Sequence, residues 1–384
     1  MKISKIPIKD NDTLYKFYNQ CINEKVLAID TEFIRENTYY PSLCLIQIAG
    51  SDFASAIDPF SGIDLSIIWK LLANKNILKV FHAAKQDIEI FLNLTGEIPY
   101  PIYDTQIAAM FCGLGDQIGY EGLVNKFLGL SVNKELQFTN WLQRPLSKNQ
   151  IDYAISDVTH LMKIYPLIEK LINKSNRTEW VEKEMQSISD QNLYKIDPFD
   201  IWKRIKLKNS KPKTLNLLKY LAAWRENECK EKNIPRNKLI RDEVLVNVSY
   251  QSPQNIVELK KIRAFPKQLS HKNCNDIIET IQNANKIIQE DWPNVIKTYK
   301  KSNISSNSVE LLRLLLKVSS EESGLAEKLI ANSDDLRDLI EAKNNDLRVF
   351  KGWRNDVFGK EAISLLNGNL GFRLENGQVK KIQI

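Results

Sequence analysis

The sequence predicts an α/β domain built on a mixed sheet, followed by two small all-α domains. In the front third of the chain, short apolar runs alternate with segments of helical periodicity, which is the pattern of a sheet covered by helices. From residue 171 onward the strand pattern nearly disappears and helical periodicity dominates. The length of 384 residues suits two or three domains and excludes a single small module.

Four apolar runs in the front third predict strands, because each is short and bounded by polar or turn residues. Gly50, Ser51 and Asp52 separate the second run from the third, and this step predicts a tight hairpin turn. A hairpin within an alternation of strands and helices predicts a sheet of mixed direction. The expected strands are Val26–Phe33, Leu43–Ala49, Phe53–Asp58 and Ile77–His82.

Helical periodicity fills the segments between and after these runs. The longest helix begins near Lys148, because Ser147 followed three residues later by Gln150 forms a capping box. We expect it to end or kink near Tyr165, since Pro166 disfavours helical geometry in the residue before it. Other helices are expected over Leu65–Ala73, Lys85–Leu94, Thr105–Phe111, Leu215–Cys229, Asn273–Gln289, Ser308–Val318 and Leu325–Leu347.

Composition narrows the kinds of function. The five cysteines are scattered and include no C-x-x-C pair, which argues against a disulfide framework or a zinc ribbon and favours a reducing, cytoplasmic compartment. With only three histidines, any bound metal is expected to be a hard cation on oxygen ligands. No apolar stretch approaches the ~18 residues of a membrane span. Residues 1–10 also lack the apolar core of a signal peptide, so no membrane partner is expected.

Charge is distributed unevenly along the chain, whose net charge is +7. Residues 1–170 contain 16 basic and 19 acidic residues (net −3), against 38 and 28 in residues 171–384 (net +10). This asymmetry fits chemistry in the front part and attraction of a polyanion by the rear part. Enrichment in lysine and asparagine across the source genome would produce the same excess.

Asp30 and Glu32 stand two residues apart in the strand-like segment AIDTEF, so both side chains point to the same face of the sheet. Adjacent carboxylates repel each other unless a cation lies between them, and Mg²⁺ or Mn²⁺ is the usual cation. An exposed strand end with two solvated carboxylates would have the same spacing. This spacing alone does not decide between the two interpretations.

Two further acidic elements follow along the chain. Asp87 falls in the first turn of the helix after the fourth strand, where a carboxylate can also simply complement the helix dipole. Tyr153 and Asp157 are spaced i, i+4 on the long helix and share a face. A packed tyrosine beside a solvated aspartate would give that spacing too. Each element is weak by itself, but their combination in this order is specific.

In this order, the four carboxylates and the tyrosine resemble the motifs of the DEDD exonuclease superfamily. The resemblance implies a ribonuclease H-like exonuclease domain with a mixed sheet. Tyr153 stands four residues before Asp157, and Asp152, not a histidine, stands five before it, so the chain resembles the tyrosine branch. All five motif residues are present, which argues against a catalytically dead relative.

The resemblance implies hydrolysis of a phosphodiester with two cations, Mg²⁺ or Mn²⁺, that activate a water and stabilise the leaving 3′-oxygen. It assigns Asp30, Glu32 and Asp157 to the metal that carries the nucleophilic water. Asp30 would bridge to the second metal, with Asp87 contributing through a water. Tyr153 would orient the attacking water, because a phenol with a pKa of about 10 is a poor general base.

Three neighbouring side chains have both a structural and a functional interpretation. His82 could bind substrate, although a structural histidine at the end of a strand is the better interpretation. Phe33 could stack on the terminal base of a single strand, and core packing explains it equally well. Asp104 is expected to cap the helix that follows it and is left outside the site.

The rear of the chain resembles HRDC domains, which are small helical modules that bind nucleic acids. Trp224–Arg225 and Pro235–Asn237 carry the resemblance in the first block, and Trp353–Arg354 with Phe358 carry it in the second. An exonuclease followed by two such modules resembles the ribonuclease D family. The expected boundaries are 1–170 for the 3′-5′ exonuclease domain, 171–210 for a linker with connecting helices, 211–290 for the HRDC domain and 291–384 for a second HRDC-like domain.

The resemblance implies a bacterial 3′-5′ exoribonuclease that trims tRNA precursors with 3′ extensions and releases 5′-mononucleotides. RNA is the expected partner, a monomer the expected state, and no nucleotide cofactor is expected. A basic run would grip the phosphates of the folded RNA, unless it is merely a solvated linker. Its members are Lys203, Arg204, Lys206, Lys208, Lys211 and Lys213. Two alternatives stay open: a 3′-5′ DNA exonuclease of the same fold, and a non-catalytic RNA-binding protein.

Overall fold

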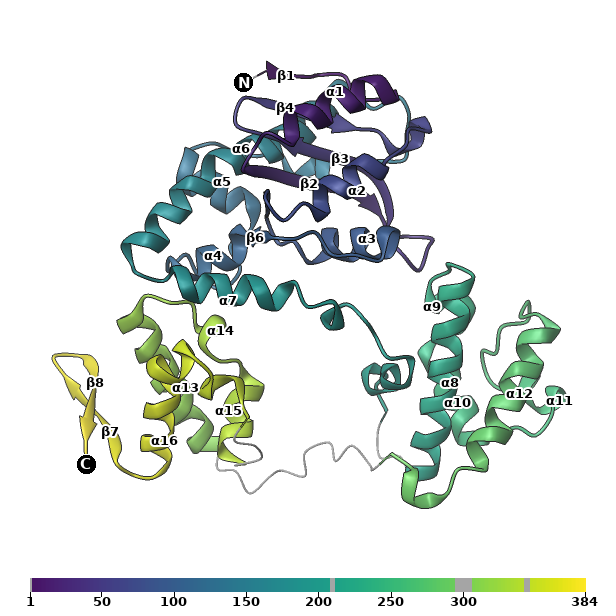
Figure 1. Ribbon diagram of the computed structural model, residues 1–384. Coiled ribbons are helices and arrows are strands. Elements are labelled where there is room, and N and C mark those ends of the chain that lie inside the picture. Colours follow the sequence, from purple (N-terminus) through teal and green to yellow (C-terminus); the bar gives the residue numbers. More distant parts are fainter. Residues whose placement is uncertain (1, 208–210, 294–305, 342–345) are drawn as a thin grey trace. The chain divides into compact units, whose positions relative to one another are not determined.

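A computed structural model describes residues 2–207, 211–293, 306–341 and 346–384 (Figure 1). The chain divides into two compact units, and each unit combines segments that are far apart in the sequence. Unit 1 consists of Met1–Glu32, Cys44–Ser189 and Lys301–Ile384. Unit 2 consists of Phe33–Leu43 and Asp190–Lys300. None of the described helices is both long and apolar enough to cross a membrane.

The core of unit 1 is a six-stranded sheet with the order β1-β4-β3-β2-β5-β6 among the described residues. β3 and β4 pair antiparallel across the turn predicted at Gly50–Asp52, whereas β2–β5, β5–β6 and β1–β4 pair parallel. The prediction of a mixed sheet is therefore confirmed. β1 and β6 were not expected, because two or three residues carry no recognisable alternation. The bounds are β1 Lys2–Ile3, β2 Val26–Ile34, β3 Ser42–Ala49, β4 Phe53–Ile57, β5 Leu78–Phe81 and β6 Ile102–Asp104.

Helices surround this sheet, and the longest begins where the capping box predicts. Ser147 Oγ accepts from the Gln150 backbone N–H at 3.2 Å, and Gln150 Oε1 accepts from the Ser147 N–H at 3.0 Å. The bounds are α1 Asn11–Cys21, α2 Ser66–Ala73, α3 Lys85–Thr95, α4 Thr105–Phe111, α5 Tyr120–Leu128, α6 Lys148–Lys174 and α7 Thr178–Ile188. The expected end of α6 near Tyr165 is wrong, because the helix continues through Pro166. Pro166 is exposed, so water can bond the carbonyl that lacks its N–H partner, while Ile164 and Ile168 on the opposite side are buried.

The C-terminal segment of unit 1 contacts α7 and the last residue of α4 through aromatic side chains. Arg177 donates to the backbone oxygens of Phe111 and Ser323, and Trp180 stacks on Trp353 with ring centres 5.3 Å apart. Arg354 pairs with Glu184 at 2.7 Å. The helices here are α13 Ser306–Ser323, α14 Glu327–Ile330, α15 Ser333–Ile340 and α16 Lys360–Leu366.

Two expectations for this C-terminal segment need correction. The single helix expected over Leu325–Leu347 is broken, because Asn332 starts a new helix with its own capping box. Residues 342–345 of that range lie outside the described residues. The chain then ends in an antiparallel hairpin, β7 Leu370–Glu375 and β8 Gln378–Gln383, where only helices were expected. Asn376 and Gly377 form its turn with φ of 50° and 76°, and this Asn-Gly pair is a hairpin signal that was present in the sequence.

Unit 2 is built around one central helix, α8, whose Leu218, Leu221 and Ala222 are fully buried. Its helices are α8 Pro212–Glu231, α9 Arg236–Leu239, α10 Asp242–Gln251, α11 Ile256–Lys260 and α12 His271–Asn285, preceded by the 3-10 segment η4 Pro198–Arg204. Trp202 from η4 and Tyr39 from the front of the chain join the same hydrophobic core. The described part of Asp190–Lys300 is thus all-helical, as predicted.

Candidate active site

Three carboxylates meet where the central strand β2 lies next to the long helix α6. Asp30 and Glu32 point to the same face because they are two residues apart on β2. Asp157 joins them from α6, and one oxygen from each of the three carboxylates lies within 4.8 Å of the others. The sheet places β2 between β3 and β5, so this cluster lies at a central strand of the sheet in unit 1.

Asp87 lies in the first turn of α3 and is tied to the same strand. Its carboxylate accepts a hydrogen bond from Thr31 Oγ1 at 2.5 Å, and Thr31 stands between Asp30 and Glu32. The negative charge of Asp87 contributes to raising the pKa of Glu32, so the fourth carboxylate lies within electrostatic reach of the cluster. The structure therefore brings all four predicted acidic residues together, with Asp87 at the margin.

The pKa values of these carboxylates are shifted in one direction. Burial raises the pKa of Asp30 to about 6. Burial, followed by the charges of Asp30, Asp157 and Asp87, raises the pKa of Glu32 to about 10. Burial and the nearby Asp30 charge raise the pKa values of Asp87 and Asp157 well above the ordinary range.

No lysine or arginine of the described chain pairs with the four carboxylates, and Asp157 Oδ1 is buried without a hydrogen-bond partner. A buried carboxylate cluster of this kind is stable in its ionised form only if a cation joins it. Oxygen donors are the ligands that hard divalent cations prefer. The residues present therefore fit a divalent metal site.

Tyr153 lies one helical turn before Asp157 on α6, and its hydroxyl donates to the Asp157 carboxylate. Burial and the surrounding negative charges raise the pKa of Tyr153 above its usual value, so the phenol stays protonated at neutral pH. The ring lies 6.3 Å from that of Trp141, which is almost fully buried. Tyr153 is thus held as a hydrogen-bond donor at the edge of the cluster.

Phe33 and His82 are not members of this cluster. Phe33 follows Glu32 on β2, is half-buried, and is the first residue of unit 2. His82 Nδ1 lies 3.0 Å from Thr105 Oγ1, and its ring packs edge-on against Tyr120. Burial lowers the pKa of His82 to about 4, so the imidazole is neutral at pH 7. Their roles in substrate binding stay predictions.

Asp104 does more than the helix capping expected of it. As N-cap of α4 it accepts from the backbone N–H groups of Gln106 and Ile107. The same carboxylate accepts from Ala83 N at 3.1 Å and Ala84 N at 2.9 Å, which form the turn between β5 and α3. Asp104 therefore fixes the start of the helix that carries Asp87. The sequence signalled the cap, whereas the bonds to the turn join residues about 20 positions apart.

A second support, which the sequence did not predict, holds the segment before α6. Arg144 donates to both oxygens of Asp58, at 2.7 and 2.8 Å, and to the backbone oxygen of Cys44 at 2.7 Å. It thereby ties the β3–β4 hairpin to the start of the helix that carries Tyr153 and Asp157. Tyr120 adds a hydrogen bond from its hydroxyl to the Asp157 backbone oxygen at 2.6 Å. No local pattern marks Arg144 or Tyr120.

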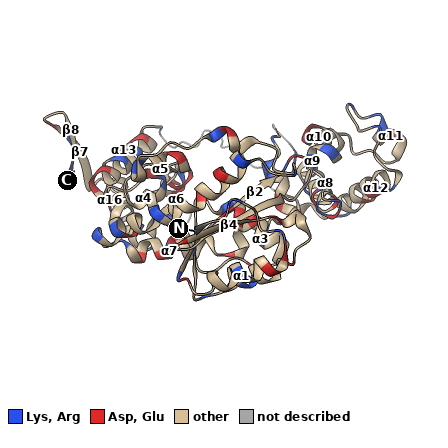
Figure 2. Cartoon of the chain, turned by 90° about the horizontal axis from the view of Figure 1, so that it is seen from above, with Lys and Arg blue, Asp and Glu red and all other residues tan. Residues whose placement is uncertain are grey.

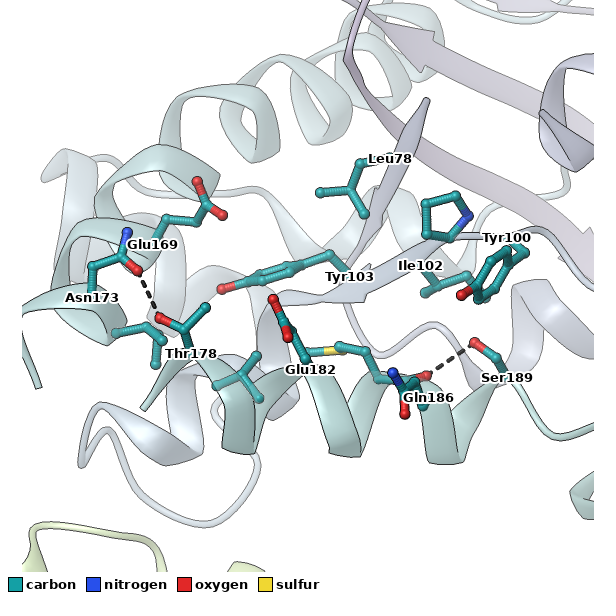
Figure 3. Close-up of a pocket in the computed structure, with 14 residues that line it drawn as sticks. Leu78, Tyr100, Ile102, Tyr103, Glu169, Asn173, Thr178, Glu182, Gln186 and Ser189 are labelled. Carbon is teal, nitrogen blue, oxygen red and sulfur yellow. Dashed lines mark hydrogen bonds between the residues drawn. The ribbon is translucent and has the colours of Figure 1, made fainter. Parts of the chain in front are cut away.

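A cavity of about 310 Å³ lies elsewhere in unit 1, between β6, the end of α6 and α7 (Figure 3). Tyr100, Tyr103, Glu169 and Glu182 line it, together with apolar side chains. None of the four clustered carboxylates or Tyr153 is among its lining residues. The carboxylate cluster, and not this cavity, is therefore the candidate active site.

The described members of the basic run between Lys203 and Lys213 have exposed side chains in unit 2. Figure 2 shows basic and acidic residues interspersed on the helices of this unit. Lys203 pairs with Asp200 at 2.6 Å, and Lys219 lies 5.8 Å from the ring centres of Phe199 and Tyr220. The exposed members of the run are Lys203, Arg204, Lys206, Lys211 and Lys213, while Lys208 lies outside the described residues.

Comparison with known proteins agrees with this geometry. Residues 6–173 match a family model described as a 3′-5′ exonuclease, and residues 214–281 match the HRDC domain. A ribonuclease D of Sphingobium indicum is 40% identical over 97% of this chain and 97% of its own length, and one of Zymomonas mobilis is 41% identical over 97% and 96%. The crystal structure of Escherichia coli RNase D, described as an exoribonuclease involved in structured RNA processing, superposes with a TM-score of 0.81 at 27% identity. It covers 96% of this chain and 99% of that one.

The fold and the site thus define a 3′-5′ exonuclease with a carboxylate cluster that fits a divalent metal, followed by an HRDC domain. Its relatives narrow the class to enzymes that act on RNA. The chain belongs to the ribonuclease D family and is a 3′-5′ exoribonuclease. The resemblance to this family, and the ribonuclease H-like domain with HRDC that it implied, are confirmed.

Proposed function

We propose that this chain hydrolyses RNA from the 3′ end by a two-metal-ion mechanism and releases 5′-mononucleotides in the 3′ maturation of tRNA precursors. The observation that carries the proposal is the cluster of Asp30, Glu32 and Asp157, whose oxygens lie within 4.8 Å of one another without a basic partner in the described chain. The free cysteines support a reducing, cytoplasmic setting. A monomer is the expected state.

Asp30, Glu32 and Asp157 would hold one Mg²⁺ or Mn²⁺, and Asp30 with Asp87 would hold a second. When bound, two such cations supply activation of a water and stabilisation of the leaving 3′-oxygen. Thr31 fixes the Asp87 carboxylate for this task through its 2.5 Å hydrogen bond. Tyr153 keeps its proton and orients the attacking water by hydrogen bonding, because its raised pKa makes it a poor base.

RNA contacts would be divided between the two units. Exposed lysines and Arg204 of unit 2 would grip the phosphates of the folded RNA body. Phe33, directly after Glu32, would stack on the terminal base, and His82 would line the substrate path as a neutral group. The proposed domains are 1–170, 211–290 and 291–384, with 171–210 as a linker with connecting helices and the last domain as a second HRDC-like module. Structured RNA is the class of substrate named for the Escherichia coli relative.

The test is incubation of a tRNA that carries a 3′ extension, with Mg²⁺ and with chelator, followed at nucleotide resolution. We expect stepwise shortening from the 3′ end with Mg²⁺ alone. Asp30→Asn should abolish cleavage and leave RNA binding nearly intact. The matched control is Asp152→Asn, a half-exposed carboxylate on α6 that lies 3.8 Å from Lys5 and outside the cluster. Full activity of Asp30→Asn would overturn the two-metal mechanism.

Matched RNA and DNA single strands, digested in parallel, separate the remaining alternatives. Faster decay of the DNA strand would favour a DNA exonuclease of this fold. Binding without any shortening of either strand would favour a non-catalytic RNA-binding protein. Shortening that stops at random positions, not at a defined mature end, would remove tRNA maturation from the proposal and leave the nuclease.

A further inference from the structure

The segment Phe33–Leu43 comprises the last two residues of β2, the loop that follows and the first two residues of β3, and it belongs to unit 2. Unit 1 contains the chain up to Glu32 and resumes at Cys44, while Phe33–Leu43 between them is part of the helical unit. Tyr39 in this loop is 8% exposed and belongs to the hydrophobic core formed around α8. The HRDC region therefore holds a side chain that follows Glu32 by only seven positions.

A buried polar network holds Tyr39 in that core. Its hydroxyl donates to Glu226 on α8, whose side chain is fully buried. Arg236 at the start of α9 donates to both oxygens of Glu226, at 2.5 and 2.6 Å, and its guanidinium lies 5.3 Å from the centre of the Tyr39 ring. Bidentate pairs of this kind have one preferred geometry, so the network fixes the position of Tyr39 and not only its burial.

Contacts on either side of Tyr39 extend this attachment. Tyr40 N donates to Asn233 Oδ1 at 3.0 Å, and Lys238 Nζ donates to Asn37 Oδ1. Within the loop, Arg35 Nε donates to the Tyr39 backbone oxygen at 3.2 Å. The loop is therefore bound to the helical unit at several points and braced internally.

Both ends of this segment are strand residues, of β2 and β3, and they continue directly into the parts of these strands that belong to unit 1. Its first end continues β2, which carries Asp30 and Glu32. Its second end leads into Cys44, whose backbone oxygen accepts from Arg144. A displacement of the loop must therefore be transmitted to the strand that holds two of the clustered carboxylates, because little free chain separates Glu32 from the anchored segment.

We propose that the segment Phe33–Leu43, through the loop between β2 and β3, lets the HRDC domain set the position of Glu32, with Tyr39, Glu226 and Arg236 acting as positioning residues of the exonuclease reaction. The inference rests on the proposed role of Glu32 as a metal ligand. RNA held by the HRDC domain then stiffens the loop and with it the metal site, so that binding the RNA body favours cleavage at its 3′ end. Small displacements of groups that hold reactants have large effects on the reaction rate, so a small shift of the loop is enough to change the rate of cleavage.

The test compares Tyr39→Phe, which keeps the ring and removes only the hydroxyl, with wild type on a diribonucleotide that presents a single scissile bond. We expect kcat to fall by about tenfold with an unchanged KM, because the metal site and not substrate binding is displaced. Mn²⁺ titration followed by electron paramagnetic resonance, without RNA, should show weaker binding in the same variant. Lys238→Ala, at an exposed contact, should show a smaller change in the same direction.

Tyr40→Phe is the matched control, because Tyr40 contacts the HRDC domain through its backbone nitrogen, which the substitution retains. Melting temperatures of all variants establish that they fold. Wild-type kcat and Mn²⁺ affinity in folded Tyr39→Phe would overturn the inference. Equal losses in Tyr40→Phe would overturn it too. Asp30→Asn separates the two proposals: if it binds Mn²⁺ like wild type, the metal site itself fails, whatever Tyr39→Phe shows.

Discussion

Buried carboxylates occur in both units, and their pKa values are shifted in opposite directions in the two units. In unit 2, burial tends to raise the pKa of Glu226, but hydrogen bonds from Arg236 and Tyr39 and the Arg236 charge lower it below its ordinary value. In unit 1, burial and mutual repulsion raise the pKa values of Asp30, Glu32, Asp87 and Asp157. No basic residue of the described chain offsets these shifts.

The difference separates structural from functional charge. A buried ion is tolerated when the fold supplies its partner, as Arg236 does for Glu226. A buried ion without a partner costs free energy, which the rest of the fold must offset. In unit 1 a divalent cation from outside the chain would supply the missing partner. Removing a carboxylate should therefore damage activity in one unit and stability in the other.

The largest effect is expected from Asp157→Asn. Bound metal ions contribute several kcal/mol to transition-state stabilisation, so nucleotide release should fall on the order of 10³-fold or more. In metal-free buffer the same variant should melt at or above the wild-type temperature, because the amide removes the cost of burying an unpaired carboxyl group beside Asp30. Release assays and scanning calorimetry with chelator measure the two quantities. A clear loss of stability without metal would show that Asp157 is a structural charge like Glu226.

Glu226→Gln should have the opposite profile. It leaves Arg236 without its anionic partner and should lower the free energy of unfolding by about 3 kcal/mol. Urea unfolding followed by tryptophan fluorescence measures this change. Glu231→Gln, at the exposed end of α8, is the control and should stay within about 0.5 kcal/mol of wild type. If both glutamates give equal effects, the Glu226 network has no special role in stability.

Mg²⁺ should supply the positive charge that the carboxylate cluster of unit 1 lacks, and should thereby stabilise the fold. At about one hundred times its dissociation constant, Mg²⁺ should stabilise the wild type by about 2–3 kcal/mol, and chelator should reverse the gain. Asp157→Asn should lose most of this stabilisation, whereas Glu226→Gln should keep it. Thermal unfolding across a Mg²⁺ series measures both. An equal response in the two variants would mean that Mg²⁺ acts elsewhere on the chain.

The smallest expected effect is the loss of the stabilisation by Glu226 at acidic pH. Because the folded-state pKa of Glu226 lies below its unfolded value of about 4.3, the unfolded chain takes up the proton first as pH falls. The stabilisation from the network is therefore complete above about pH 6 and is lost as pH falls through the folded pKa. Unfolding free energies of wild type and Glu226→Gln should converge on acidification. A difference that stays constant down to about pH 3 would contradict the lowered pKa.

Local patterns predicted much of unit 1. The central strands, the hairpin turn and the start of α6 follow from period-2 alternation and a capping box, which depend only on neighbours in sequence. Asp30 with Glu32, and Tyr153 with Asp157, share faces for the same local reason. That Asp157 reaches Asp30 required the packing of α6 on the sheet, and the family motifs supplied this from their order along the chain.

The features that the sequence did not predict depend on partners far apart in the sequence, or on solvent exposure that only the fold determines. Arg144 bonds Asp58 across 86 positions, and Tyr39 bonds Glu226 across 187. Pro166 fits inside α6 because it faces solvent, which its neighbours in sequence do not reveal. The C-terminal hairpin is the exception, since Asn376–Gly377 carried a local signal.

The participation of Tyr39 in the core around α8 also bears on how this protein is made and how it can be divided. Phe33–Leu43 is synthesised long before α8. The hydrophobic core around α8 can therefore form only after the rest of the sheet domain has been synthesised. The segment that matches the HRDC model, residues 214–281, lacks Tyr39. Excised or transplanted into another protein, it would carry an unfilled site for one tyrosine and a glutamate–arginine pair exposed on one side. In this protein, the core of the HRDC domain is therefore completed by a tyrosine from the part of the sequence that encodes the nuclease.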